Sequence, residues 1–175
     1  MTARVVLEGA EISRALTRIS HEILEANKGA QGLIIVGIPT RGSILAQRIA
    51  DIIGRIDGTT VFAGQLDVTM YRDDLAHQPT RTPQATVMPE SGIDDSTIVL
   101  VDDVLYSGRT VRAALDALGA HGRPRAVQLA ALIDRGHREL PIRADYIGKN
   151  LPSSKGERIS VRLAEVDGSD EVTIS

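Results

Sequence analysis

The chain has 175 residues, a formal net charge of −3, no cysteine and only 2% aromatic residues. Its length suits one domain with its own core, because a folded chain of this size buries about 70% of the surface it exposes when unfolded. The composition excludes disulfides and thiolate metal ligands and gives no overall attraction to polyanions. We therefore expect a single domain over residues 1–175, with any nucleic-acid binding confined to a local patch.

The sequence gives no sign of a membrane protein. No apolar signal segment follows Met1 to Arg4, and no apolar run approaches the roughly 20 residues that span a bilayer. We expect a cytoplasmic protein with no membrane partner.

Apolar runs alternate along the chain with segments of helical period. In the segment 11–27, for example, apolar residues recur at spacings of four, three and four and so share one face. The pattern predicts, in chain order, a helix over 11–27, a strand over 33–38, a helix over 43–53, strands over 60–70 and 97–101, a helix over 108–120 and a strand over 126–133. This alternation is typical of an α/β fold with a mostly parallel sheet flanked by helices.

Between Tyr71 and Asp95 the sequence is polar, rich in Asp, Pro and Thr, and without a period. Irregular segments of this length are uncommon in compact domains and tend to be lids, binding loops or protruding hairpins. We expect a mobile functional loop over about residues 71–90, with a plain surface excursion as the alternative.

The most informative segment is Ile98 to Thr110, IVLVDDVLYSGRT, in which a buried strand leads through Asp102 and Asp103 into a hydroxyl-rich turn and a helix. N–H groups at the start of a helix that follows a parallel strand, helped by the hydroxyls of Ser107 and Thr110, can bind a phosphate. Two carboxylates would repel that phosphate unless they met sugar hydroxyls or Mg²⁺, so the pair indicates ribose recognition. Either feature alone would be read as a polar strand end or a helix cap.

The combination resembles the diphosphoribosyl-binding motif of the type I phosphoribosyltransferases. The resemblance implies their fold, with a flexible lid loop and a small hood beside the central sheet. It also implies the substrate 5-phosphoribosyl-1-diphosphate, with Mg²⁺ as cofactor, bound mainly through the substrate and possibly also by Asp102 and Asp103. The implied phosphate and ribose site comprises Val101, Asp102, Asp103, Val104, Leu105, Tyr106, Ser107, Gly108, Arg109 and Thr110.

A second loop, Thr40-Arg41-Gly42, follows the first buried strand and can place N–H groups and a guanidinium on a diphosphate. Taken alone it would be a turn with a solvated arginine, but the family places its diphosphate loop here. The resemblance further assigns Tyr71, Arg72 and Asp73 to the start of the lid, where Arg72 would neutralise the diphosphate. The catalytic residues implied are Asp102, Asp103, Arg41 and Arg72.

The runs 132–142 and 144–149 are similar to one subgroup, the bifunctional regulators that bind pyrimidine operon RNA and resemble uracil phosphoribosyltransferases. The likeness covers nearly the whole chain and implies uracil as the base. The implied hood consists of the N-terminal segment and about residues 134–175. The candidate base contacts are Ile133, Asp134, Arg135 and Ile159, and a solvated loop is the alternative for His137 and Arg138.

Basic residues on the first helix suggest an RNA-binding face. Arg14, Arg18 and His21 lie opposite the apolar stripe, although Glu22 and Glu25 could pair with them and such faces are usually solvated. The resemblance implies a homodimer or higher homo-oligomer that binds leader mRNA and responds to UMP or UTP. The candidate RNA contacts are Arg14, Thr17, Arg18, His21, Arg143, Lys149 and Lys155.

Without cysteine or a marked Ser-His-Asp constellation, the sequence favours direct displacement, in which uracil N1 attacks C1 as diphosphate leaves. Three functions remain open: an RNA regulator with uracil phosphoribosyltransferase activity, a salvage enzyme alone for uracil or a purine, and a nucleotide-sensing regulator without catalysis. We favour the first, and the third is disfavoured because both Asp residues, the Thr40–Gly42 loop and Tyr71-Arg72 are all present.

Overall fold

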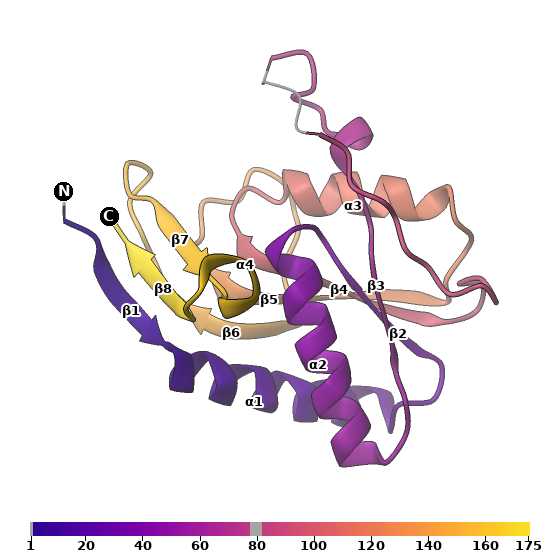
Figure 1. Cartoon of the computed structure of the whole chain (residues 1–175). Coiled ribbons are helices and arrows are strands. Elements are labelled where there is room, and N and C mark those ends of the chain that lie inside the picture. Colours follow the sequence, from indigo (N-terminus) through magenta and orange to yellow (C-terminus); the bar gives the residue numbers. More distant parts are fainter. Residues whose placement is uncertain (1, 78–81) are drawn as a thin grey trace.

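The computed structural model describes residues 2–77 and 82–175, in which a five-stranded sheet carries helices on both faces and a three-stranded sheet lies beside it (Figure 1). The helices are α1 (Gly9–Asn27), α2 (Arg41–Asp57), α3 (Arg109–Gly119) and α4 (Ala164–Asp167), with a 3₁₀ turn η1 (Thr69–Tyr71). The strands are β1 (Arg4–Glu8), β2 (Leu33–Gly37), β3 (Phe62–Gln65), β4 (Thr97–Leu105), β5 (Ala126–Asp134), β6 (Tyr146–Asn150), β7 (Ile159–Arg162) and β8 (Glu171–Ile174).

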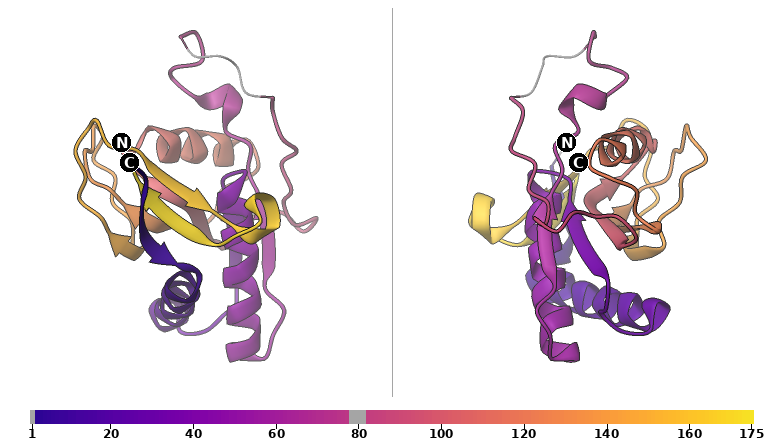
Figure 2. Two further views of the ribbon diagram at one scale, coloured as in Figure 1. Left: turned by 60° about the vertical axis from the view of Figure 1, so that its left-hand side comes forward. Right: turned by 90° about the vertical axis from the view of Figure 1, so that its right-hand side faces the viewer.

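The central sheet has the order β3-β2-β4-β5-β6, and all its neighbouring strands are parallel. Its two faces are covered separately: α1 and α2 lie on one and α3 on the other (Figure 2). Alternate residues of β4 enter the two cores, with Val99 and Val101 on the side of α1 and α2, and Ile98 and Leu100 on the side of α3. The expected α/β fold is confirmed.

The second sheet, β1-β8-β7, is antiparallel and, with α4, forms the hood. It joins the two ends of the chain, which lie close together in Figure 2. The hood boundary expected at residue 134 is wrong, because β6 pairs in parallel with β5 as the edge strand of the central sheet. Within the described residues, the small sheet consists of β1, β7 and β8, and α4 lies in the connection between β7 and β8.

Several element boundaries differ from the sequence prediction: the helix expected over 43–53 begins at Arg41 and ends at Asp57, and two strands also differ. The strand expected over 60–70 ends at Gln65, and Asp67 Oδ1 then accepts hydrogen bonds from the N–H and hydroxyl of Thr69 at the start of η1. The strand expected to end at Val101 continues to Leu105, because β5 runs beside it and pairs with it as far as Asp134.

In the described parts of the segment between η1 and β4, the backbone has no helix or strand, only an isolated bridge between Gln65 and Val87. In Figure 1 the described parts of this segment rise above α3. Residues 78–81 of the lid loop expected over 71–90 lie outside the described residues. No helix among the described residues is long and apolar enough to cross a membrane.

Candidate active site

A cleft of about 290 Å³ opens where β2 and β4 end, at the point where the strand order of the sheet reverses. Ligands of open α/β sheets bind at such switch points, because the loops after the two strands turn to opposite faces. The lining residues are Ile38, Pro39, Thr40, Arg41, Asp67, Val68, Thr69, Arg72, Thr82, Gln84, Asp102, Asp103, Val104 and Thr110. The structure therefore brings the predicted diphosphate loop, the paired carboxylates and Arg72 together around one space.

The diphosphate loop approaches β4 so closely that two positions require glycine. A Cβ on Gly42 would lie 2.5 Å from the Val101 carbonyl oxygen, and a Cβ on Gly37 would lie 2.3 Å from the Gly42 oxygen. The Ile38 N–H also donates a 2.9 Å hydrogen bond to Val101 O. These contacts hold Thr40 beside the carboxylates, and Gln84 Nε2 donates to the Thr40 hydroxyl from the returning part of the lid loop.

The paired carboxylates lie in the last part of β4, and each accepts a hydrogen bond from the next N–H group of the chain. Asp102 Oδ1 accepts from Asp103 N at 2.9 Å, and Asp103 Oδ1 accepts from Val104 N at 2.8 Å. Asp102 is only 8% exposed. Burial, followed by the charge of Asp103, raises the pKa of Asp102 well above its usual value, and Arg72 acts in the opposite direction. A cation or hydroxyl donor in the cleft would favour its charged form.

The loop predicted to bind phosphate, Tyr106 to Thr110 and here called the phosphate loop, forms a second cleft of about 210 Å³ with the start of the lid loop. This cleft shares Arg72, Asp102, Val104 and Thr110 with the first, so the two are contiguous. Gly108 has φ 93° at the N-cap of α3, and a Cβ there would lie 3.2 Å from Ile142 Cβ. The first N–H groups of a helix have no partner within the helix, so the start of α3 suits a phosphate, and the Arg109 N–H there donates to Ser107 Oγ at 3.3 Å.

The segment that follows β5 holds the phosphate loop in place. Arg138 donates from Nη1 to Tyr106 O at 2.8 Å, from Nε to Ile142 O at 2.8 Å and from Nη2 to Asp134 Oδ2 at 2.5 Å. Ser107 O also accepts from the N–H groups of residues 139 and 140. The solvated-loop alternative for Arg138 is therefore wrong. In the sequence Arg138 is only a charged residue in a predicted loop, so this role could not be predicted from it.

The four candidate base contacts do not line either cleft. Ile133 is fully buried in the core, and Asp134 is bound by Arg138. Burial would raise the pKa of Asp134, but hydrogen bonds from Arg138 and the Gly136 N–H lower it below its usual value. Ile159 lies half-buried in the hood strand β7. Contact with a base remains a prediction for these residues.

Arg135 connects the phosphate loop with the segment between β6 and β7, which leads into the hood. Its guanidinium lies 4.3 Å from the centre of the Tyr106 ring, a cation–π contact, and its Nη2 donates to the main-chain oxygens of Ser154 and Glu157. His137 meets the same ring edge-on with 5.9 Å between ring centres. The chain between β6 and β7 is thereby tied to Tyr106.

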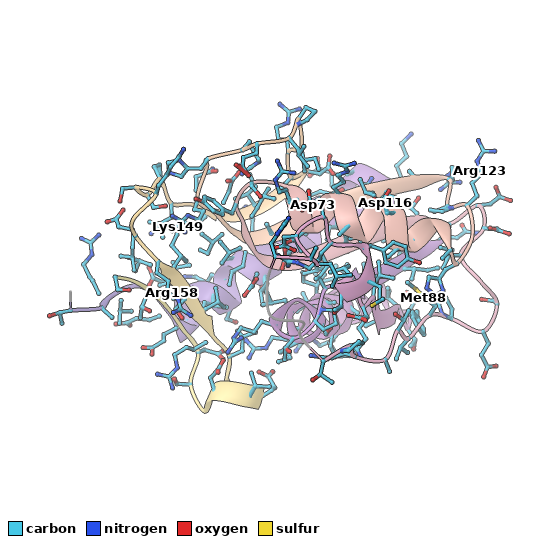
Figure 3. The ribbon with its side chains drawn as sticks, turned by 90° about the horizontal axis from the view of Figure 1, so that it is seen from above. Asp73, Met88, Asp116, Arg123, Lys149 and Arg158 are labelled. Atoms are coloured by element: carbon cyan, nitrogen blue, oxygen red, sulfur yellow. The ribbon has the colours of Figure 1, made fainter. Side chains whose placement is uncertain are left out.

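The start of the lid loop lies against the phosphate loop. Asp73 accepts a 2.6 Å hydrogen bond from Arg109 Nη1, and Figure 3 shows Asp73 at the beginning of α3. Arg72 lines both clefts and is held by Asp74 through Nε and Nη2. Tyr71 is the last residue of η1 and is exposed. The three predicted lid residues are thus brought to the site, with Asp73 in contact with its phosphate end.

The candidate RNA residues of α1 gather on its outer face, where Arg14, Thr17, Arg18 and His21 line a shallow depression. Arg18 pairs with Glu22 at 2.8 Å, and its Nη2 donates to two carbonyls of β6, so the expected charge pairing is confirmed for this residue. The other three candidates are exposed: Lys149 lies on β6, and Arg143 and Lys155 precede and follow that strand.

Two kinds of comparison identify the relatives of this chain. Residues 5–165 match the phosphoribosyl transferase domain family. The chain is 68% identical to bifunctional protein PyrR of Leifsonia xyli, over 99% of this chain and 97% of that protein. It is 60% identical to bifunctional protein PyrR of Streptomyces coelicolor, over 98% and 89% of the two chains, and 55% identical to that of Clostridioides difficile, over 97% and 96%.

Solved structures show the same fold at low identity. A hypoxanthine phosphoribosyltransferase of Trypanosoma cruzi superposes with a TM-score of 0.74 at 14% identity, over 98% of this chain and 94% of that one. One from Staphylococcus aureus gives 0.70 at 18% identity, over 97% and 90%. With the family match and the full-length similarity to PyrR proteins, the chain belongs to the phosphoribosyl transferase family and, within it, to the PyrR group.

Proposed function

We propose that this chain converts uracil and 5-phosphoribosyl-1-diphosphate to UMP and diphosphate, and that it binds the leader mRNA of a pyrimidine operon in response to UMP or UTP. The observation that carries the enzymatic part is the pair of contiguous clefts, in which the phosphate loop, Asp102, Asp103 and Arg41 surround one space. The relatives at 51–68% identity are all named bifunctional, which supports a second activity beside phosphoribosyl transfer.

The order of groups along the clefts fits the order of groups in the substrate. The 5-phosphate would bind at residues 106–110, the ribose hydroxyls at Asp102 and Asp103, and the diphosphate at residues 40–42 and Arg72. Holding both reactants in line can contribute roughly 7–11 kcal/mol to lowering the barrier. The two carboxylates would stabilise the positive charge that develops at C1 during direct displacement.

The cleft suits Mg²⁺ that arrives with the diphosphate. Among residues 2–77 and 82–175, no cluster of three or more His, Asp or Glu is arranged to hold a metal by itself. Magnesium commonly keeps several waters and is bound by one or two carboxylates together with phosphate oxygens, and Asp102 and Asp103, which line the cleft, would be the carboxylates available to it. When bound, the ion would offset the charge of the leaving diphosphate.

The RNA-binding part rests on the outer face of α1, where Arg14, Thr17, Arg18 and His21 lie together. A net charge of −3 requires that basic groups be gathered locally, and a homodimer or higher homo-oligomer would place the faces of several subunits on one RNA. We place this activity in the cytoplasm.

The first experiment is conversion of labelled uracil to UMP with 5-phosphoribosyl-1-diphosphate and Mg²⁺, beside guanine and hypoxanthine. Product from uracil alone is expected. Product from a purine would overturn the choice of base but keep the site, and no product from any base would leave a nucleotide-sensing regulator. Gel-shift titration of the leader transcript, with and without UMP, tests the second activity, and equal affinity for an unrelated transcript would contradict it.

A further inference from the structure

Arg41 is held by a residue of the hood that lies 126 positions later in the chain. Its Nε donates to Asp167 Oδ2 at 3.1 Å and its Nη2 to Asp167 Oδ1 at 2.8 Å, a two-point pair. The side chains are 35% and 17% exposed. The pair therefore fixes the plane of the guanidinium as well as its position, because both parallel hydrogen bonds require the two groups to be coplanar.

The Asp167 carboxylate is itself fixed within α4. Its Oδ2 accepts a 2.8 Å hydrogen bond from Leu163 N, and its main-chain oxygen accepts from Arg162 Nη2. Arg48, two helical turns after Arg41 on α2, clamps the same part of the hood. Its guanidinium binds Glu165 at 2.6 Å and Asp170 at 2.8 Å. α4 is thus anchored to α2 independently of Arg41.

Arg41 lines the cleft, whereas Asp167 is not among the lining residues. The carboxylate takes the edge of the guanidinium formed by Nε and Nη2, so that the remaining Nη1 donors are left for a ligand. We propose that Asp167 is a positioning residue that holds Arg41 in the orientation needed to bind the diphosphate. This inference rests on the proposed function, since it requires that Arg41 binds diphosphate.

A positioning role and a purely electrostatic role for Asp167 predict opposite changes in diphosphate binding when its charge is removed, which makes the proposal testable. If Asp167 acted only as a charge near the cleft, or competed with diphosphate for Arg41, its neutralisation would strengthen anion binding. If it positions Arg41, the loss of the two-point pair weakens binding despite the gain of one positive unit. The sign of the change therefore separates the two roles.

The experiment compares Asp167→Asn with Glu165→Gln, a matched control that removes one negative charge from the same short helix without touching Arg41. Inorganic diphosphate with Mg²⁺ is titrated into each full-length protein by calorimetry, and KM and kcat for 5-phosphoribosyl-1-diphosphate are measured. For Asp167→Asn we expect about tenfold weaker diphosphate binding and a raised KM, a loss comparable to that of one charge-assisted hydrogen bond. For Glu165→Gln we expect unchanged binding and KM. The melting temperatures of both variants should stay close to that of the unsubstituted protein.

Equal or tighter binding by Asp167→Asn would overturn the proposal. An Arg41→Ala background provides a second check, because the effect of Asp167→Asn must then disappear, and an effect that persists would also overturn it. Failure of the proposed function looks different: the unsubstituted protein would itself bind no diphosphate in the presence of Mg²⁺, and that result would overturn both proposals at once.

Discussion

Arg138 Nη1 donates a 2.8 Å hydrogen bond to the main-chain oxygen of Tyr106 and so connects the segment after β5 to the phosphate loop. The same guanidinium binds Asp134 at the end of β5 and the carbonyl of Ile142. Two separate points of the backbone and one largely buried carboxylate are thereby held by one side chain. The segment that carries the resemblance to pyrimidine regulators thus supports the loop that we propose as the sugar-phosphate site.

Replacement of Arg138 by alanine should loosen the phosphate loop and destabilise the fold. The side chain of Asp134, 12% exposed, would lose its charged partner and keep only the hydrogen bond from the Gly136 N–H, and a lost hydrogen bond to a charged group of this kind costs about 2–3 kcal/mol. We expect a melting temperature lower by roughly 5–10 °C and a raised KM for 5-phosphoribosyl-1-diphosphate. Arg123→Ala is the control, because Arg123 is exposed near the far end of α3 (Figure 3). Equal melting temperatures for both variants would contradict this role.

Asp103→Asn should lower uracil turnover about a hundredfold while the fold stays intact. The asparagine Oδ1 can still accept the hydrogen bond from Val104 N, so only the negative charge beside the developing positive C1 is lost. Steady-state kinetics and a melting curve measure the two effects separately. Turnover equal to that of the unsubstituted protein would remove Asp103 from the mechanism.

Asp102→Asn should stabilise the protein, and more so at high pH. Burial raises the pKa of Asp102 in the folded state, so the native protein holds this proton more tightly than the unfolded chain. The resulting stability is fully present below the unfolded pKa of about 3.9 and is lost as pH rises through the folded value. The melting-temperature gain of the variant over the unsubstituted protein is therefore expected to be larger at pH 8 than at pH 4.5. A gain that is the same at both pH values would mean that Asp102 does not titrate abnormally.

Arg14→Ala and Arg18→Ala should weaken leader RNA binding and leave uracil conversion unchanged. Each lost phosphate contact would reduce the salt slope of log K by about 0.7–0.9. Arg18 also binds the β6 carbonyls, so its variant should additionally lower the melting temperature, whereas Arg14→Ala should not. Gel-shift titrations at several salt concentrations supply the measurement. If neither variant changes RNA affinity, this face of α1 is not the RNA site.

The amino-acid sequence by itself determined the α/β class, the order of the main elements and the central motif. Periodicity places Ile12 and Leu16 on one face of a helix, and the run from Ile98 to Val101 has the composition of a buried parallel strand. The Asp102-Asp103 pair and the Ser107 to Thr110 turn are contiguous in the chain, so their proximity required no tertiary information. The limit of this reasoning was β6, whose five residues are too few to show whether they join the hood or the central sheet.

Only the tertiary structure decided which distant residues act on the site. Arg138 reaches back to Tyr106, and Arg41 meets Asp167 across the boundary between the two sheets. In the sequence each of these residues is an ordinary charged group in a loop or a helix end. A long arginine side chain has many possible partners in an unfolded chain, and sequence spacing selects none of them. The packing of the hood against α2 and of the segment after β5 against the phosphate loop fixes the choice, because it brings one particular acceptor within hydrogen-bond distance of each guanidinium.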